Sequence, residues 1–187
     1  MNNDATVVFV PGLRQDDPNH WQTLLQGKLP DSVCVPRMAL DDPHRLSCDA
    51  WVETLNQTIG TVTGDVVLVA HSAGCAIVAH WARRYLRPVK GALLATPPDL
   101  SEQLPTPYPD LDTLQRNGWL PLPIHALPFH SIVAASTNDP LGRFDRVAEL
   151  AAHWGSDIVV VGALGHLNPA SGFGEWPQAE DLLDRLG

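Results

Sequence analysis

The sequence contains little cysteine, little basic charge and no long apolar run, and each shortage excludes a class of protein. Its three cysteines, Cys34, Cys48 and Cys75, are odd in number and scattered, so they predict a reduced, cytoplasmic protein without a disulfide framework. The formal net charge of −9 argues against a nucleic-acid partner, because phosphate binding needs clustered lysine and arginine. The N-terminus lacks the basic start and apolar core of a signal peptide, and no later run is long enough to span a bilayer.

Metal-binding motifs are also missing. The eight histidines include no pair with the H-E-x-x-H spacing that holds zinc, and the sequence has no C-x-x-C pair. We therefore expect neither a structural nor a catalytic metal ion.

Six short apolar runs indicate the fold class. Most are apolar nearly throughout, which is typical of parallel strands covered by helices on both faces. The runs are residues 6–10, 33–35, 66–70, 91–95, 131–135 and 158–161. Helical patterns lie between most of these runs, and a last helix follows Pro177. The patterns are residues 19–29, 47–59, 72–86 and 144–151. The chain thus predicts a single α/β domain over residues 1–187, with a six-stranded, mostly parallel, doubly wound sheet and helices on both faces.

One long segment interrupts this alternation. Residues 96–128 carry eight prolines and contain one short candidate helix, at 111–116. Long irregular segments in compact domains are often lids or binding loops, and a loop that merely covers the sheet edge accounts for the pattern equally well.

The stretch Ala70-His71-Ser72-Ala73-Gly74 joins the third apolar run to a helix. It is a variant of the nucleophile elbow G-x-S-x-G, with alanine in the first position. A serine on this turn has its hydroxyl clear of the sheet and beside a helix N-terminus, which favours a developing oxyanion. The competing interpretation is that Ser72 only caps the helix. We expect His71 to pack against its neighbours rather than to catalyse.

A serine nucleophile needs a base, and the base needs a carboxylate to orient it. Asp139 follows the fifth run, and His166 follows the sixth in a glycine-flanked loop, so both lie past the ends of predicted strands. The chain order Ser72, Asp139, His166 is that of α/β hydrolases. Asp99, after the fourth run, is the alternative acid, and His153, within a predicted helix, is a poor candidate for the base.

Two backbone N–H groups are expected to form an oxyanion hole. One belongs to Ala73, directly after the serine, and the other to Leu13 in the loop after the first strand, with the Arg14 N–H as the less favoured alternative. Arg14, His20, Trp21, Leu141 and Leu167 are the candidates for a substrate pocket, with a helix-start role as the alternative for His20. Trp119, Phe144, Phe173 and Trp176 are further apolar candidates, and ordinary core burial is the competing interpretation for every apolar one.

Several motifs together resemble a known family. FVPGLR followed by NHW, then LVAHSAGC, ASTNDPLGRF and GHLNPASGFGEWP, are similar to the small serine hydrolases of the retinoblastoma-binding-protein-9 and YdeN type. The resemblance spans nearly the whole chain. It implies a compact α/β-hydrolase fold without a large cap domain, and a triad of Ser72, Asp139 and His166. The family's namesake carries a partner-binding Leu-x-Cys-x-Glu motif, but residues 46–50 lack the glutamate, so that role is not carried over.

These observations favour a serine hydrolase that cleaves a small ester, or less readily a thioester or amide, without a cofactor. The alternative is a protein-interaction module that keeps the hydrolase fold without catalysis, as the proline-rich segment 96–128 and the partner-binding precedent would allow. No particular protein partner is indicated.

Overall fold

Six strands form one sheet in the order β2-β1-β3-β4-β5-β6, and every neighbouring pair is parallel. The strands of this computed structural model, which describes residues 5–14 and 16–186, are β1 (Thr6–Val10), β2 (Val33–Cys34), β3 (Val66–His71), β4 (Gly91–Ala95), β5 (His130–Ser136) and β6 (Asp157–Gly162). The helices are α1 (Trp21–Lys28), α2 (Cys48–Gly60), α3 (Ala73–Arg84), α4 (Leu111–Arg116), α5 (Phe144–Trp154) and α6 (Gln178–Asp184). The predicted fold class is confirmed, and the sheet is wholly parallel.

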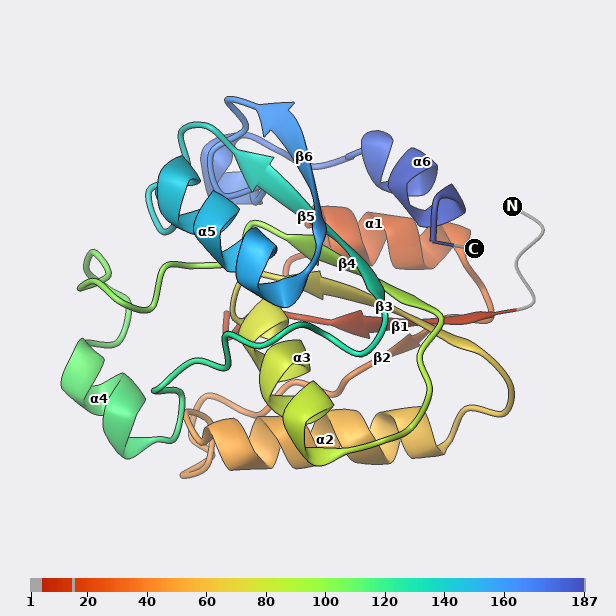
Figure 1. The fold of residues 1–187 in the computed structure, drawn as a ribbon, viewed down its shortest axis with the longest axis horizontal. Coiled ribbons are helices and arrows are strands. Elements are labelled where there is room, and N and C mark those ends of the chain that lie inside the picture. Colours follow the sequence, from red (N-terminus) through yellow and green to blue (C-terminus); the bar gives the residue numbers. More distant parts are fainter. Residues whose placement is uncertain (1–4, 15, 187) are drawn as a thin grey trace.

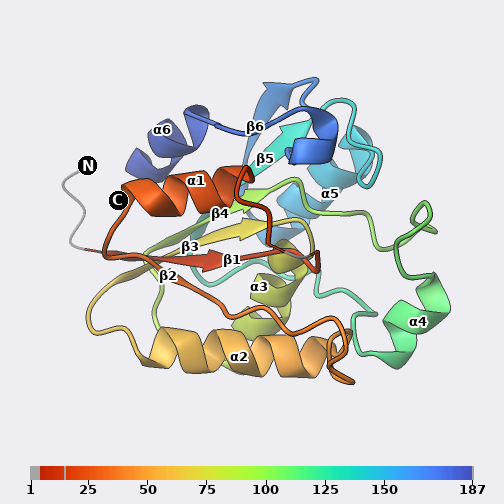
Figure 2. The ribbon, with the colours of Figure 1, turned by 180° about the vertical axis from the view of Figure 1, so that it is seen from behind.

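Helices cover the two faces of the sheet in separate layers (Figure 1; Figure 2). Helices α1 and α6 share a core cluster with the odd-numbered side chains of β1 and β3, such as Phe9 and Val69, while α2 and α3 lie on the face of the even-numbered ones, such as Val8 and Leu68. Helix α5 covers that second face at β5. This division follows from the two-residue period of a strand, since successive side chains point to opposite faces. Among the described residues no helix combines the length and apolar character that a membrane span requires.

The local signals read from the sequence place the helices well. Ser47 caps α2, with its hydroxyl accepting a hydrogen bond from the Ala50 N–H, as predicted. The short helix expected at 111–116 is α4, and Asp110 caps it. It lies beyond the carboxyl ends of the strands, apart from both helix layers, in both views (Figure 1; Figure 2).

Strand β6 departs from the expectation of burial on both faces. It forms one edge of the sheet, and Ile158 and Val160 are 40% and 53% exposed. Val159 and Val161 point to the other face and pack against the α1–α6 core. The sequence of an edge strand therefore resembles that of a central strand, although two of its apolar side chains remain exposed.

Gly74 permits the close approach of α3 to the end of β1. A Cβ atom at this position would lie 2.2 Å from the Val10 carbonyl oxygen, and backbone atoms cannot yield as a side chain can. Gly74→Ala is expected to lower the free energy of unfolding by about 3 kcal/mol in urea denaturation, because the helix must shift.

Gly27→Ala in α1 is the matched control, since nothing lies within 4 Å of its added methyl group. That substitution should raise stability by up to about 1 kcal/mol, because alanine is the better helix former. Equal effects at the two glycines would contradict the close approach described above.

Candidate active site

Ser72 lies on the turn between β3 and α3 in a strained conformation. Its backbone φ of 56° and ψ of −128° lie in a region that residues with a side chain rarely adopt. The Ser72 N–H donates to the Ala95 carbonyl at 3.0 Å, which ties the turn to β4. The side chain makes no capping hydrogen bond to α3, so the interpretation of Ser72 as a simple helix cap is wrong.

His166 joins Ser72 to Asp139 through hydrogen bonds at both ring nitrogens. Its Nε2 lies 2.8 Å from Ser72 Oγ, and its Nδ1 lies 2.8 and 3.0 Å from the two carboxylate oxygens of Asp139. A carboxylate can only accept, so Nδ1 carries the proton and Nε2 is free to accept from the serine hydroxyl. The His166 and Asp139 side chains are almost fully buried.

The parallel sheet brings these three residues together. Ser72, Asp139 and His166 follow β3, β5 and β6, and 94 positions separate the serine from the histidine. The Asp139 carboxylate also accepts from the Leu141 N–H at 2.8 Å, which fixes its orientation. Asp99, the alternative acid, instead pairs with Arg146 at 3.5 Å and accepts from Ser101.

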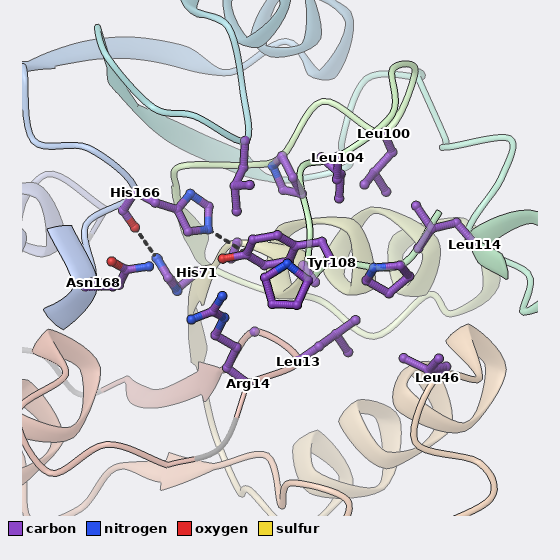
Figure 3. Close-up of a pocket in the computed structure, with 18 of the residues that line it drawn as sticks. Leu13, Arg14, Leu46, His71, Leu100, Leu104, Tyr108, Leu114, His166 and Asn168 are labelled. Carbon is purple, nitrogen blue, oxygen red and sulfur yellow. Dashed lines mark hydrogen bonds between the residues drawn. The ribbon is translucent and has the colours of Figure 1, made fainter. Parts of the chain in front are cut away.

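The backbone of His166 is held on both sides. Its carbonyl accepts from His71 Nε2 at 2.9 Å (Figure 3). Its N–H donates to Ser171 Oγ at 3.0 Å. Burial, together with the neighbouring His166 and His20 rings, holds the pKa of His71 well below its usual 6.5. His71 is therefore a neutral donor that positions the His166 loop, in line with the packing role expected for it.

His20 caps α1, and its Nδ1 accepts from the Gln22 N–H at 3.2 Å. The helix-start role is correct, but the residue is buried against the His71 ring rather than solvated, and it also lines the cavity described below. Burial, with a contribution from Arg37, lowers the pKa of His20 from 6.5 to about 4.

This shift predicts acid sensitivity. His20 binds a proton from about pH 6.5 downward in the unfolded chain, but only near pH 4 in the folded chain. The free energy of unfolding is therefore highest above pH 6.5 and decreases as the pH falls. The loss is about 3 kcal/mol by pH 4. His20→Asn keeps a capping acceptor without titrating, and should flatten the pH dependence of urea unfolding by that amount. His125→Asn, at an exposed position, is the control, and an unchanged slope in His20→Asn would refute the assignment.

The expected oxyanion donors lie beside Ser72. Ala73 is the first residue of α3, and a Cβ atom on Gly12 would be 3.6 Å from Ser72 Oγ, so the loop after β1 lies against the serine. Neither the Leu13 nor the Ala73 N–H donates to another residue within 5–14 and 16–186. Arg37 Nη1 bonds the Gly12 carbonyl at 2.7 Å, which holds the loop in place.

A cavity of about 600 Å³ opens at Ser72 and His166. Arg14, His20 and Leu141, three of the five predicted pocket residues, line it, and so does Trp119. Its wall is formed largely by the irregular segment 96–128, through Leu100, Leu104, Tyr108, Leu114 and several prolines.

Trp21 and Leu167 do not line this cavity, which corrects the prediction. Both are buried in the α1–α6 core, where Trp21 packs edge-on against Trp176 with ring centroids 4.9 Å apart. Leu167 has a φ of 45°, and this turn directs its side chain into the core instead of the site. Phe144, Phe173 and Trp176 also lie outside the cavity lining.

No group of three His, Cys, Asp or Glu side chains in the described part of the chain is placed to hold a metal ion. The chemistry available at the site is that of a serine, an imidazole and a carboxylate.

The fold is that of the α/β-hydrolase superfamily, and residues 5–14 and 16–186 form no large cap domain. Within that superfamily, the chain belongs to the serine hydrolase family, whose model matches residues 7–185. The family resemblance read from the sequence motifs is thereby confirmed.

Individual relatives agree with this placement. The candidate hydrolase YdeN of Bacillus subtilis is 27% identical over 179 residues, which cover 95% of this chain and 93% of that protein. The crystal structure of a candidate YdeN-like hydrolase from Pectobacterium atrosepticum matches with a TM-score of 0.81 and 27% identity, covering 97% of this chain and 90% of that one. A thermophilic esterase from Thermogutta terrifontis, 17% identical with a TM-score of 0.63, covers 97% of this chain and 90% of its own and shares the fold.

Proposed function

We propose that the protein hydrolyses a small carboxylic ester through an acyl-enzyme at Ser72. The observation that carries this proposal is the continuous chain of hydrogen bonds from Ser72 Oγ through His166 to Asp139. The strained backbone of Ser72 adds to it. A nucleophile, its base and the group that orients the base are the parts that acyl transfer requires. Thioesters and amides are less favoured substrates of the same chemistry.

The first half of the reaction forms the acyl-enzyme. His166 Nε2 takes the Ser72 proton as Oγ attacks the carbonyl carbon, and the carbonyl oxygen becomes an oxyanion held by the Leu13 and Ala73 N–H groups. His166 then returns the proton to the departing alcohol, and the ester C–O bond breaks. Asp139 remains ionised throughout and stabilises the imidazolium.

The second half releases the acid. Water gives a proton to His166 and attacks the acyl carbon, a second tetrahedral oxyanion forms, and its collapse frees the carboxylic acid while Ser72 regains its proton. The substrate and water supply every atom that is exchanged, so the reaction needs no cofactor.

Labelling by a fluorophosphonate probe tests the proposal. The probe should modify the protein stoichiometrically on the peptide that contains Ser72, because it reacts with an activated serine. Ser72→Ala should take no label, whereas Ser101→Ala, which removes an exposed hydroxyl outside the cavity, should be labelled as the wild type is. A wild-type protein that resists the probe would favour the protein-interaction module, and a labelled Ser72→Ala would exclude Ser72 as nucleophile.

We also propose that the protein is cytoplasmic. Its three cysteines are unpaired, and burial raises the pKa of Cys48 to about 12, which leaves that thiol protonated and inert. Three free thiols, two of them buried, support a reducing compartment.

A further inference from the structure

The cavity has two chemically different ends (Figure 3). His71, His166, Asn168 and Arg14 gather at one end, and four leucines gather at the other, with Tyr108 between the two groups. The leucines are Leu46, Leu100, Leu104 and Leu114. We call this side the leucine arm and the opposite side the polar end. An extended ligand that reaches both would itself have one apolar and one polar part.

Three of the four leucines of the arm are buried, and Leu46 is half-buried. Leu100, Leu104 and Leu114 are 5%, 8% and 3% exposed, and all three belong to the same core cluster as α2 and α3. Trp119 lines the same cavity and donates through its ring N–H to the Leu46 carbonyl, which ties the arm to the start of α2. Such walls favour an apolar chain, because each methylene that leaves water contributes to binding.

The polar end carries a cation, Arg14, that has no ion pair within the described part of the chain. Arg14 is exposed, and its guanidinium lies 4.7 Å from the centre of the Tyr108 ring. Of the other two arginines of the lining, Arg37 pairs with Asp16 and donates to the Gly12 carbonyl. Arg45, beside Leu46, donates to the Leu13 carbonyl at 3.4 Å, and it too forms no ion pair with a described residue.

One carboxylate, Asp17, also lines the cavity, and it accepts from the Asn19 N–H at 2.8 Å. Arg14 itself points toward Tyr108 and His71, into the centre of the site (Figure 3).

The order of chemical events decides which part of the ester takes which end. The acyl group stays covalently attached to Ser72 while the alcohol leaves and water takes its place. The alcohol therefore needs the more exposed polar end of the cavity, and the acyl chain can remain in the leucine arm. We propose that the substrate is an ester of an apolar acid, with its chain in the leucine arm, and of an alcohol that bears an anionic group bound by Arg14. This inference rests on the proposed esterase function.

A chain-length series tests the leucine arm. With 4-nitrophenyl esters from acetate to dodecanoate, kcat/KM should rise about four-fold per methylene until the arm is full. Leu46→Trp fills the arm and should lower the ratio of octanoate to acetate turnover about ten-fold. Leu86→Trp is the matched control, since Leu86 is 98% exposed and far from the lining, and it should keep the wild-type ratio.

Leu104→Phe provides a second blocking variant if Leu46→Trp does not fold, as judged by circular dichroism. Turnover that falls with every added carbon in the wild type, or an unchanged ratio in the blocking variants, would overturn the assignment of the arm.

A pair of matched leaving groups tests Arg14. The butyrate ester of 3-hydroxybenzoate should be cleaved about ten-fold faster, in kcat/KM, than the butyrate ester of methyl 3-hydroxybenzoate, because a guanidinium binds a carboxylate through charge-assisted hydrogen bonds. Arg14→Gln should remove this preference. Arg83→Gln makes the same change in net charge at an exposed position on α3, outside the cavity, and should keep it.

The orientation has its own test. 4-Nitrophenyl hydrogen glutarate carries its charge on the acyl side and should be a poorer substrate than 4-nitrophenyl valerate. Faster cleavage of the glutarate ester, or an equal loss on both benzoate esters in Arg14→Gln, would contradict the proposal.

A binding measurement separates this inference from the hydrolase proposal itself. The intact ester 3-(octanoyloxy)benzoate should bind Ser72→Ala in calorimetry, and adding Arg14→Gln should weaken binding about ten-fold. Absence of turnover with this binding intact would contradict only the proposed function. Binding that does not depend on Arg14 would contradict the inference, whatever the turnover.

Discussion

Ser72→Ala and His166→Ala are each expected to lower kcat for 4-nitrophenyl ester hydrolysis by about a million-fold, and the double variant by no more than either one alone. The reason is the 2.8 Å hydrogen bond between Ser72 Oγ and His166 Nε2, through which the two side chains act as one unit. Without the imidazole, the hydroxyl keeps its proton. Without the hydroxyl, the imidazole has no nucleophile to activate. The effect is measured from initial rates of ester hydrolysis, after contaminating esterases have been removed from the preparation.

His153→Ala is the control for this prediction. His153 is an exposed histidine on α5, and it does not line the cavity at Ser72, so its removal should leave kcat unchanged. Losses that multiply in the Ser72→Ala, His166→Ala double variant would show that the two residues act independently, which is incompatible with the acyl-enzyme mechanism. A serine variant with wild-type turnover would refute Ser72 as the nucleophile.

Asp139→Asn is expected to lower kcat by about ten-thousand-fold while the fold is retained. The amide can still accept the Leu141 N–H through its oxygen, as the carboxylate does at 2.8 Å, so the loop after β5 keeps its anchor. Its NH₂ group, however, would donate to His166 Nδ1 and move the imidazole proton to Nε2. The ring then faces Ser72 with a donor and cannot accept the serine proton.

Asp99→Asn is the matched control, because Asp99 is the other aspartate that follows a strand and it pairs with Arg146 instead of a histidine. It should retain nearly full turnover. Thermal unfolding of both variants separates a chemical defect from a folding defect. An Asp139→Asn enzyme within ten-fold of wild type would show that His166 is oriented by other contacts, of which the His71 bond to its carbonyl is the first to examine.

The sequence predicted the chemistry of the site better than its shape. Ser72, Asp139 and His166 all follow apolar runs, and parallel strands deliver their carboxyl ends to one edge, so pattern alone brought them together. The lining contributed by Leu100 and Leu104 could not be read in the same way. Their segment has no helix or strand period, and its path is set by tertiary packing and proline geometry that no local rule specifies.

Trp21 and Leu167 show why adjacency in the chain misleads. Each follows a residue that lines the cavity, His20 and His166 respectively, yet each side chain is buried in the core. Consecutive side chains at the start of a helix or in a tight turn point in different directions, and a left-handed residue such as Leu167 redirects the chain further. The expectation that β6 is buried on both faces was wrong for a related reason. The sequence of a strand does not show whether another element covers it, and β6 lies at the edge of the sheet.

The strand ends and segment 96–128 supply different parts of the site, and this division has an evolutionary consequence. The groups that would break and form bonds are anchored to the ends of a parallel sheet, while much of the surface that would select a molecule belongs to one stretch outside both helix layers (Figure 2). Insertions or exchanges in that stretch can diversify specificity without disturbing the reaction, because loops tolerate change that packed strands do not. Descendants of such a chain can therefore acquire new ligands while Ser72, Asp139 and His166 keep their places at the strand ends.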